Sequence, residues 1–207
     1  AYYFLCLACS SVDVPLDAET IVQQNEPAVV VIFADKEGRR GAFQASGCCI
    51  HPSGLVLSTA HFVLGAEVYR GVFPDGQEYR LTVAAVDSGR DLALFKTDRS
   101  VGQAARIGDA WTLRKGAPLL AITAPKSLAF TVTTGIVSNL TRTYRDNPVI
   151  QTTLALGAGS SGGPVFDRYG TLVGIVFGRI EEFPDSTLIY PITVSYTHLT
   201  LPTNREV

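Results

Sequence analysis

Short strand-like runs separated by turn residues recur along most of this 207-residue chain, and helical periodicity is almost absent. The runs are rich in Val, Ile, Thr and aromatic residues, and Pro-Gly turns such as "HPSG" and "PDGQ" separate them. About eleven runs with hairpin-like spacing predict an all-β sandwich or barrel. The runs are residues 28–34, 42–50, 54–58, 79–86, 91–97, 117–123, 129–137, 149–156, 163–166, 171–177 and 187–193. Helical hints are confined to residues 17–25 and to the turn at residues 60–63.

The stretch "RIGDAWTLRKGAP" (106–118) is typical of a connection between two sets of strands. Roughly eleven strands are too many for one small barrel but suit two barrels of about six strands each. The sequence therefore predicts an all-β protein of two packed six-stranded antiparallel β-barrels. We place the barrels at residues 18–112 and 113–194, and we expect a cleft between them in which side chains from both halves meet.

Composition excludes several classes of protein. Hydrophobic residues make up 46% of the chain and charged residues 17%, which indicates a globular rather than a disordered protein. The net charge is −2 and no basic run is interleaved with aromatics, so nucleic acid is not an expected partner. Cys48 and Cys49 are neighbours, and Cα atoms only about 3.8 Å apart disfavour a disulfide between them. We expect no structural disulfide, so packing must hold the fold together.

Both ends look foreign to the predicted domain. Residues 1–12 include the run "AYYFLCLACSS", which is too short to span a bilayer and resembles the end of an export signal. Ala8 before Cys9 resembles a lipoprotein cleavage site, which would anchor the protein to a membrane through a lipid on Cys9. A clipped ordinary export signal explains the same residues. Residues 195–207 resemble a translated adapter, and we leave them out of the fold prediction.

The chain has three histidines, few enough to consider one by one. His198 lies in the foreign tail, and His51 begins a turn, as a solvated loop histidine would. His61 follows the apolar run "LVLSTA". Asp91 opens the apolar run "DLALFKT", although carboxylates are rarely buried unless paired. Taken singly, His61 is equally well a histidine at the barrel rim and Asp91 a turn aspartate.

The segment "GAGSSGGPVFD" (157–167) is either a flexible linker or a backbone cradle for a reactive serine. A nucleophilic serine needs a base, and the base needs a group that orients it. Asp91 lies 30 residues after His61, and Ser161 lies 70 residues after Asp91. The order and spacing of these three residues are far more specific than any one of them.

With these motifs the chain resembles the chymotrypsin-like serine peptidases, and most closely the HtrA family. The resemblance covers roughly residues 25–193 and is carried by "SGCCIHPSGLVLSTAHFV", "DLALFK", "TVTTGIVS" and "VIQTTLALGAGSSGGPVF". It implies that Ser161 is the nucleophile, that His61 is the general base, and that Asp91 orients the imidazole. By the same analogy, the backbone N–H groups of Gly159 and Ser161 form the oxyanion hole.

The resemblance also bears on specificity and activation. Ala155, with Leu156 beside it, occupies the expected substrate pocket, where enzymes that cut after Arg or Lys carry an aspartate. An uncharged methyl group offers no partner for a buried cation, so small or medium aliphatic residues are expected before the scissile bond. Ser160 stands where digestive enzymes have an aspartate that pairs with a freed N-terminus, so activation by N-terminal cleavage is not supported.

Two segments and the pair of vicinal cysteines each allow a functional and a purely structural interpretation. Residues 138–148 and 177–186 correspond to regulatory loops of the family, but they are equally well plain solvated turns. Cys48 or Cys49 near the base could suggest a cysteine nucleophile. Packing as small hydrophobic residues explains them better, with strand alternation pointing one of them inward.

Our interpretation of the whole chain is an exported serine endopeptidase, periplasmic or associated with the bacterial cell envelope. Its expected substrates are extended or unfolded polypeptides, and its mechanism requires no metal or organic cofactor. One alternative is a catalytically silent peptide-binding module on the same fold. An esterase is less favoured, because "GSSGG" fits its G-x-S-x-G motif without the strand–turn–helix context. Family members commonly form homotrimers and carry a PDZ domain, and no residue of this chain bears on either feature.

Overall fold

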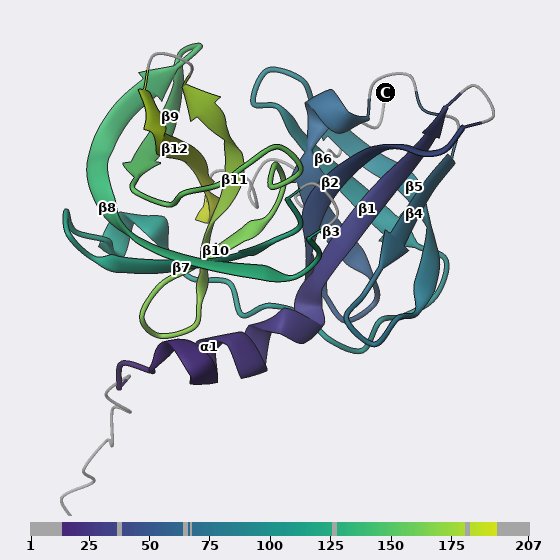
Figure 1. Ribbon diagram of the computed structural model, residues 1–207, viewed down its shortest axis with the longest axis horizontal. Coiled ribbons are helices and arrows are strands. Elements are labelled where there is room, and N and C mark those ends of the chain that lie inside the picture. Colours follow the sequence, from purple (N-terminus) through teal and green to yellow (C-terminus); the bar gives the residue numbers. More distant parts are fainter. Residues whose placement is uncertain are drawn as a thin grey trace, which may run out of the picture.

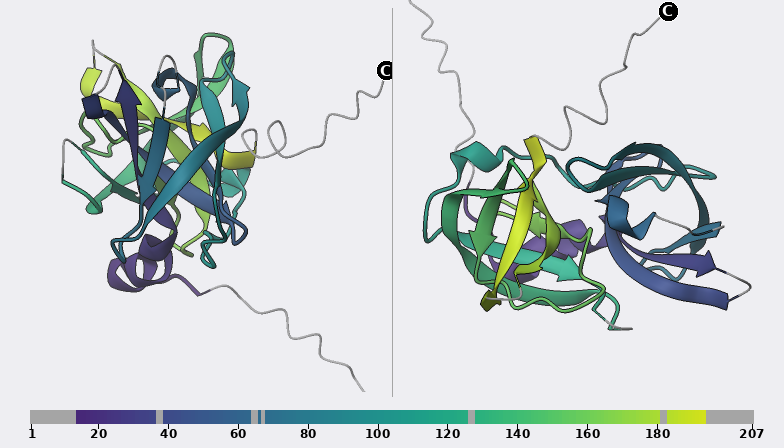
Figure 2. Two further views of the ribbon diagram at one scale, coloured as in Figure 1. Left: turned by 90° about the vertical axis from the view of Figure 1, so that its right-hand side faces the viewer. Right: turned by 90° about the horizontal axis from the view of Figure 1, so that it is seen from above.

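The computed structural model describes residues 14–36, 39–63, 66, 68–125, 128–180 and 183–193 of the chain. It shows two closed six-stranded barrels side by side, the first built from the N-terminal half of these residues and the second from the C-terminal half (Figures 1 and 2). Every strand pair within the barrels is antiparallel. The predicted all-β architecture of two packed six-stranded antiparallel barrels is confirmed.

The strands of the N-terminal barrel follow the order β1-β2-β3-β6-β5-β4, and the barrel closes because β1 pairs with both β2 and β4. The C-terminal barrel follows the order β10-β11-β12-β9-β8-β7 and closes through the pairing of β10 with β7. The N-terminal strands are β1 (Val29–Lys36), β2 (Arg39–His51), β3 (Leu55–Thr59), β4 (Val68–Val72), β5 (Glu78–Asp87) and β6 (Leu92–Thr97). The C-terminal strands are β7 (Pro118–Thr123), β8 (Thr131–Tyr144), β9 (Asn147–Thr152), β10 (Pro164–Phe166), β11 (Leu172–Ile180) and β12 (Phe183–Pro191). Short 3₁₀ turns are η1 (Glu26–Ala28), η2 (Ala60–Phe62) and η3 (Ala110–Thr112).

Two patterns of burial distinguish interface strands from outer strands. In β1 the first four residues, Val29 to Ile32, are all buried, because one side of the strand faces its barrel interior and the other faces β7 of the second barrel. In β5 the buried residues Tyr79 and Leu81 alternate with exposed residues, as expected for a strand with one face in water. The β-branched run of β1 is thus explained by contact with the other barrel.

The interface between the barrels is apolar and fixes how they sit against each other. Ile122, Phe166 and Ile175 of the C-terminal barrel belong to the same buried cluster as Val30 and Leu57 of the N-terminal barrel. All five side chains are no more than 1% exposed. Because such interiors are close-packed, the two barrels form a rigid frame for any side chains at their boundary.

Helix α1 (Ala18–Asn25) lies beneath the C-terminal barrel and leads through η1 into β1 (Figure 1). The Asp17 carboxylate caps it by accepting a hydrogen bond of 2.7 Å from the Thr20 N–H. Ile21 is buried, and the Leu16 N–H donates to the Arg168 carbonyl of the C-terminal barrel. The helix predicted around residues 17–25 is confirmed. Among the described residues, no helix has the length and apolar character needed to cross a membrane.

Three local expectations differ from the structure. Strand β4 was not predicted, because Arg70 and Gly71 interrupt its apolar pattern, although Tyr69 and Gly71 are buried. The segments 138–148 and 177–186, expected as loops, belong largely to the long hairpins β8–β9 and β11–β12. Both vicinal cysteines are fully buried rather than one alone. The outer face of β2 is covered there by the connecting segment, since the Ala105 N–H donates to the Cys49 carbonyl.

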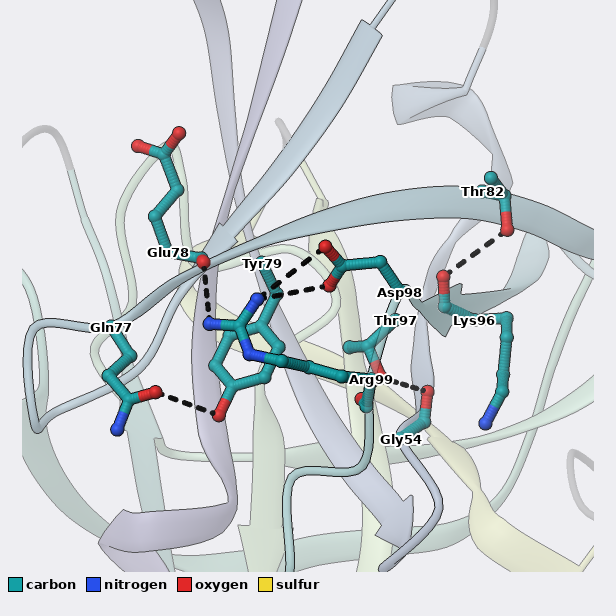
Figure 3. A network of polar contacts seen from close by, with 9 residues as sticks. All are labelled: Gly54, Gln77, Glu78, Tyr79, Thr82, Lys96, Thr97, Asp98 and Arg99. Atoms are coloured by element: carbon teal, nitrogen blue, oxygen red, sulfur yellow. Dashed lines mark hydrogen bonds and ion pairs between the residues drawn. The ribbon is translucent and has the colours of Figure 1, made fainter.

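A polar network closes one end of the N-terminal barrel around Gly54, in the turn between β2 and β3 (Figure 3). The Thr97 hydroxyl lies 3.1 Å from the Gly54 carbonyl oxygen and 2.6 Å from that of Arg99. The Arg99 guanidinium lies over the Tyr79 ring, 3.9 Å from its centroid. Gly54 has φ +95°, and a Cβ at this position would lie 1.6 Å from the Thr97 hydroxyl.

We predict that Gly54→Ala destabilises the protein more than Gly76→Ala. Gly76 in the β4–β5 turn also has positive φ, but its Cβ would meet nothing within 4 Å. Gly76→Ala should cost about 1–2 kcal/mol from the left-handed backbone alone. Gly54→Ala should cost about a further 1–3 kcal/mol from overpacking against Thr97. Urea unfolding of both variants tests this, and equal losses would mean that Thr97 moves aside without penalty.

Candidate active site

His61 and Asp91 meet at the rim of the N-terminal barrel. His61 sits in η2, just after β3, and Asp91 precedes β6, which pairs with β3 through Thr59 and Leu92. The His61 Nδ1 lies 2.6 Å from Asp91 Oδ2, and the His61 backbone N–H donates to Asp91 Oδ1 at 2.6 Å. With the carboxylate accepting at Nδ1, the imidazole keeps Nε2 as a free acceptor. The imidazole is 52% exposed and the carboxylate 17%, so the ring stands between the carboxylate and solvent.

Asp91 adopts a strained backbone conformation with φ 55°. A left-handed conformation costs a non-glycine residue about 1–2 kcal/mol. Three hydrogen bonds maintain it here, because the Asp91 carbonyl also accepts from the Ala60 N–H at 3.0 Å. Strain of this kind concentrates at functional sites. The aspartate is therefore more than an ordinary turn residue.

The glycine-rich segment before β10 forms a tight loop that presents Ser161. Gly159 has φ +95° and Gly162 φ +83°, conformations that favour glycine. The Gly163 N–H donates to the Ser160 carbonyl at 3.0 Å, and the Gly162 N–H donates to the Val176 carbonyl at 2.8 Å. A Cβ on Gly162 would lie 2.2 Å from the Ser46 carbonyl oxygen, so this loop packs directly on β2. The segment is an ordered cradle and not a flexible linker.

Ser46 of β2 holds that loop from the opposite barrel. Its hydroxyl donates to the Gly159 carbonyl at 2.9 Å and accepts from the Ala124 N–H at 2.8 Å. Its backbone N–H donates to the Ser161 carbonyl at 2.9 Å, and its own carbonyl accepts from the Ser58 hydroxyl at 2.7 Å. Ser46 has no exposed surface. Sequence reasoning assigned it no role, although a lone polar residue in the buried run before Cys48 is the available signal.

Several backbone amides of the loop form no hydrogen bond to other described residues, those of Gly157 and Ala158 among them. Among the hydrogen bonds of the described residues, none uses the N–H of Gly159 or of Ser161, whereas the N–H groups of Ser160, Gly162 and Gly163 all donate. Unpaired amides next to a serine hydroxyl are what stabilisation of a negative oxygen requires. Gly159 and Ser161 are the residues whose amides the sequence assigned to the oxyanion hole, and that role stays a prediction.

One cavity of about 480 Å³ brings the three candidate side chains together. His61 and Asp91 line it from the N-terminal barrel, and Ser161 lines it from the C-terminal barrel. Tyr144, Arg145, Phe177, Gly178 and Leu188 are among the remaining lining residues. Within the described part of the chain, no hydrogen bond joins the His61 ring to the Ser161 hydroxyl. Catalytic hydrogen bonds are often loose until a substrate binds, so this arrangement is compatible with a nucleophile and its base.

The wall of the cavity is aromatic. Tyr144 packs on Phe177 with ring centroids 5.0 Å apart, and Phe177 packs on Tyr190 at 4.9 Å. Burial, and then the charge of Asp91, raise the pKa of Tyr190 to about 12. An apolar wall next to the Asp91 carboxylate strengthens charge interactions in the cavity.

The residues expected to form the substrate pocket lie elsewhere around the loop. Ala155 is exposed, and Leu156 is buried in the core of the C-terminal barrel. Neither lines the cavity that holds His61 and Ser161. Their role in substrate selection stays a prediction.

A cysteine nucleophile is disfavoured at this site. Burial raises the pKa of the Cys48 thiol and of the Cys49 thiol, which disfavours the thiolate that a cysteine nucleophile needs. Across the described residues, no group of three or more His, Cys, Asp or Glu side chains is arranged to hold a metal ion.

Two six-stranded antiparallel barrels with a candidate site at their boundary define the chymotrypsin-like fold class. The family model of the trypsin-like peptidase domain matches residues 45–175, more than half of the chain. The chain belongs to this family, and within it to the HtrA/DegP-like serine proteases.

Three proteins of similar sequence support this assignment. A "probable periplasmic serine endoprotease DegP-like" of Halomonas elongata is 34% identical over 156 residues, which are 72% of this chain and 33% of the relative. The protein of the same description from Marinomonas sp. is 38% identical over 166 residues, 77% of this chain and 35% of the relative. The mitochondrial serine protease HTRA2 of Drosophila ananassae is 32% identical over 143 residues, covering 65% and 34%. The chain thus spans about a third of the length of these relatives.

A solved structure supports the fold. The HtrA-type protease AlgW with a tripeptide superposes with a TM-score of 0.82 at 26% identity, over 88% of this chain and 62% of that one. The same protease with a decapeptide gives a TM-score of 0.80 at 23% identity, which bears on the fold alone.

The raised pKa of Tyr190 predicts a loss of stability in alkali. An unfolded tyrosine ionises near pH 10, whereas the folded protein keeps Tyr190 protonated up to about pH 12. The resulting stabilisation is fully present below pH 10 and is lost as the pH rises through that window. Tyr190→Phe should therefore lose less free energy of unfolding than the wild type between these two pH values. Urea unfolding across the window measures this, and identical slopes would contradict the raised pKa.

Proposed function

We propose that this protein is a serine endopeptidase that cleaves extended or unfolded polypeptides through a His-Asp-Ser triad and an acyl-enzyme. The observation that carries the proposal is the His61–Asp91 pair, in contact at 2.6 Å, facing the same cavity as Ser161. The chain's place among the HtrA/DegP-like serine proteases supports it.

The proposed reaction begins with proton transfer from Ser161 to His61. With Nδ1 bonded to Asp91, the imidazole accepts the hydroxyl proton at Nε2 while the serine oxygen attacks the scissile carbonyl carbon. Asp91 stabilises the imidazolium that forms. The imidazolium then gives its proton to the leaving amine as the C–N bond breaks. In the second half of the reaction His61 takes a proton from water while the water oxygen attacks the acyl carbon. The imidazolium returns that proton to the Ser161 oxygen as the ester bond breaks.

The unpaired N–H groups of Gly159 and Ser161 act as the oxyanion hole in this proposal. The Ser161 N–H is held in direction because the Ser160 carbonyl, which shares its peptide plane, accepts from the Gly163 N–H. Ser46 holds the chain on either side of Ser160 through the Gly159 and Ser161 carbonyls. Donors that are already aimed at the developing charge need no reorganisation during the reaction. Loss of one such donor typically lowers turnover by about 10²–10³-fold.

Polypeptides are the proposed substrates because the cavity is lined by residues of both barrels and by the apolar side chains of Phe177 and Leu188. The related AlgW structure that is 26% identical holds a tripeptide, which supports a peptide ligand here as well. The names of the bacterial relatives support an exported, periplasmic location. Residues 1–12, on which an export signal or a lipid anchor would depend, lie outside the described residues.

A catalytically silent peptide-binding module is the second candidate. The missing hydrogen bond between the His61 ring and the Ser161 hydroxyl is the observation that favours it. An esterase of the α/β-hydrolase type is disfavoured, because the loop of Ser161 leads into the hairpin β10–β11 and not into a helix. His198, the histidine that such an order of residues needs, lies outside the described residues.

A fluorophosphonate probe separates these candidates. Ser161→Ala should abolish labelling, because the probe reacts with an activated hydroxyl. Ser160→Ala is the matched control, since the Ser160 hydroxyl is buried and faces Thr123 Oγ1 at 3.2 Å, and its loss should leave labelling intact. Mass spectrometry of the labelled peptide checks the site. Folded protein that takes no label under any condition would favour the silent module.

Ser46→Ala tests the support of the oxyanion loop. It removes the donor to the Gly159 carbonyl and the acceptor of the Ala124 N–H, so the reactive amides should lose their position. We expect kcat on a peptide substrate to fall by about 10²-fold with little change in KM.

Thr97→Val is the matched control for Ser46→Ala. It also removes a buried hydroxyl that lies near two carbonyl groups, but at the far end of the N-terminal barrel. It should lower the unfolding midpoint and leave kcat unchanged. If both variants lose kcat in proportion to their stability, Ser46 has no positioning role.

A further inference from the structure

The tip of the β8–β9 hairpin is a strained two-residue turn. Tyr144 pairs with Asn147, and between them Arg145 has φ 48° and Asp146 φ 62°. Such turns favour Asn-Gly, because both central residues need positive φ. An arginine and an aspartate are unfavourable here, and strain that persists at such a position points to a function of the side chains.

The tip is fastened to the other barrel. The Asn147 side-chain amide donates to the Gly89 carbonyl at 2.8 Å and to the Arg145 carbonyl at 3.0 Å. Gly89 lies in the β5–β6 turn, two residues before Asp91. The hairpin tip and the Asp91 turn are therefore held as one unit at the edge of the cavity.

Arg145 lines the cavity together with His61 and Ser161. Its guanidinium lies 5.4 Å from the centroid of the Tyr144 ring, and within the described residues its side chain forms no ion pair or hydrogen bond. By contrast, the nearby Arg90 pairs with Asp87 at 2.8 Å. Arg145 is thus an exposed cation with no acidic partner among the described residues.

The acidic side chains near Arg145 do not pair with it. Both carboxylate oxygens of Asp91 are bonded to His61. Asp87 is bonded to Arg90, and Asp146 is not among the residues that line the cavity. The charge of Arg145 nevertheless reaches the aromatic wall, where it opposes the effect of Asp91 on the pKa of Tyr190.

We propose that Arg145 forms a subsite for an acidic side chain, Asp or Glu, of the polypeptide substrate. The inference rests on the proposed peptidase function and deepens it by naming a substrate class. The planar guanidinium binds carboxylates through paired hydrogen bonds, and the Tyr144 and Phe177 rings beside it exclude part of the competing water.

The size of the cavity limits where the acidic residue lies in the substrate. A volume of about 480 Å³ corresponds to a span on the order of 8 Å, or two to three residues of extended chain. The acidic residue therefore lies within about three residues of the scissile bond. Because Arg145 is exposed, water and salt weaken its ion pair with a substrate carboxylate. We therefore expect kcat/KM for an acidic peptide to exceed that for its neutral counterpart by only about three- to ten-fold.

Paired fluorogenic peptides test the subsite on the full chain. Each pair differs only by Glu or its neutral isostere Gln at one position, scanned over three positions on either side of the cleaved bond. At one position the wild type should show a kcat/KM for Glu about three- to ten-fold above that for Gln, and high salt should shrink the difference. Arg145→Gln should remove the preference, and Arg145→Lys should retain part of it. Arg80→Gln, on exposed β5, is the matched control and should keep the preference.

The outcomes separate the two proposals. Hydrolysis of Gln peptides by every variant upholds the peptidase function whatever happens at Arg145. If peptides are cleaved without a Glu preference, or if the preference survives in Arg145→Gln, the subsite is wrong and the peptidase stands. If no peptide is cleaved and Ser161 takes no fluorophosphonate label, the peptidase function itself fails.

A double variant, Arg145→Asn with Asp146→Gly, examines why the strained turn is present. It supplies the residues that this turn type favours, so its unfolding midpoint should rise while the Glu preference is lost. A double variant that retains the preference would overturn the role of the Arg145 side chain.

Discussion

The buried hydroxyl of Ser46 is the contact through which one barrel positions the glycine-rich loop of the other. It satisfies the Gly159 carbonyl and the Ala124 N–H at once, in a place with no access to water. A polar group left unpaired there would carry its full desolvation cost, so the loop has one favourable arrangement and few others. The apolar interface brings the barrels together, and the hydrogen bonds of Ser46 then fix the conformation of the Ser161 segment.

The division of labour between the barrels follows from this arrangement. The N-terminal barrel supplies His61 and Asp91 as a preassembled pair on neighbouring strand ends. The C-terminal barrel supplies Ser161, the unpaired amides and the hairpin tip that carries Arg145. Each group lies within a few residues of a strand, so the close-packed barrels hold these side chains in fixed positions.

The sequence predicted the two-barrel fold because turn chemistry and β-branched runs are local signals, and it singled out His61, Asp91 and Ser161 by order and spacing. It failed where the deciding contact is distant. Strand β4 exists through pairing with β1 and β5, which no local pattern around Gly71 reports. The contacts of Ser46 with Gly159 and Ala124, and the place of Arg145 beside His61, join segments far apart in the chain, so no local pattern predicts them. The division at residue 112 and the pocket role of Ala155 stay predictions.

The order of the groups along the chain has a consequence during synthesis. The His61–Asp91 pair emerges with the first barrel, but the loop of Ser161 can take its shape only when it packs on Ser46 and Val176. Domains tend to fold as they leave the ribosome, first half first. A nascent chain would therefore carry the finished His61–Asp91 pair but no ordered Ser161 loop until β11 has joined the second barrel. Ribosome-bound intermediates of this protein are expected to be unreactive toward their neighbours.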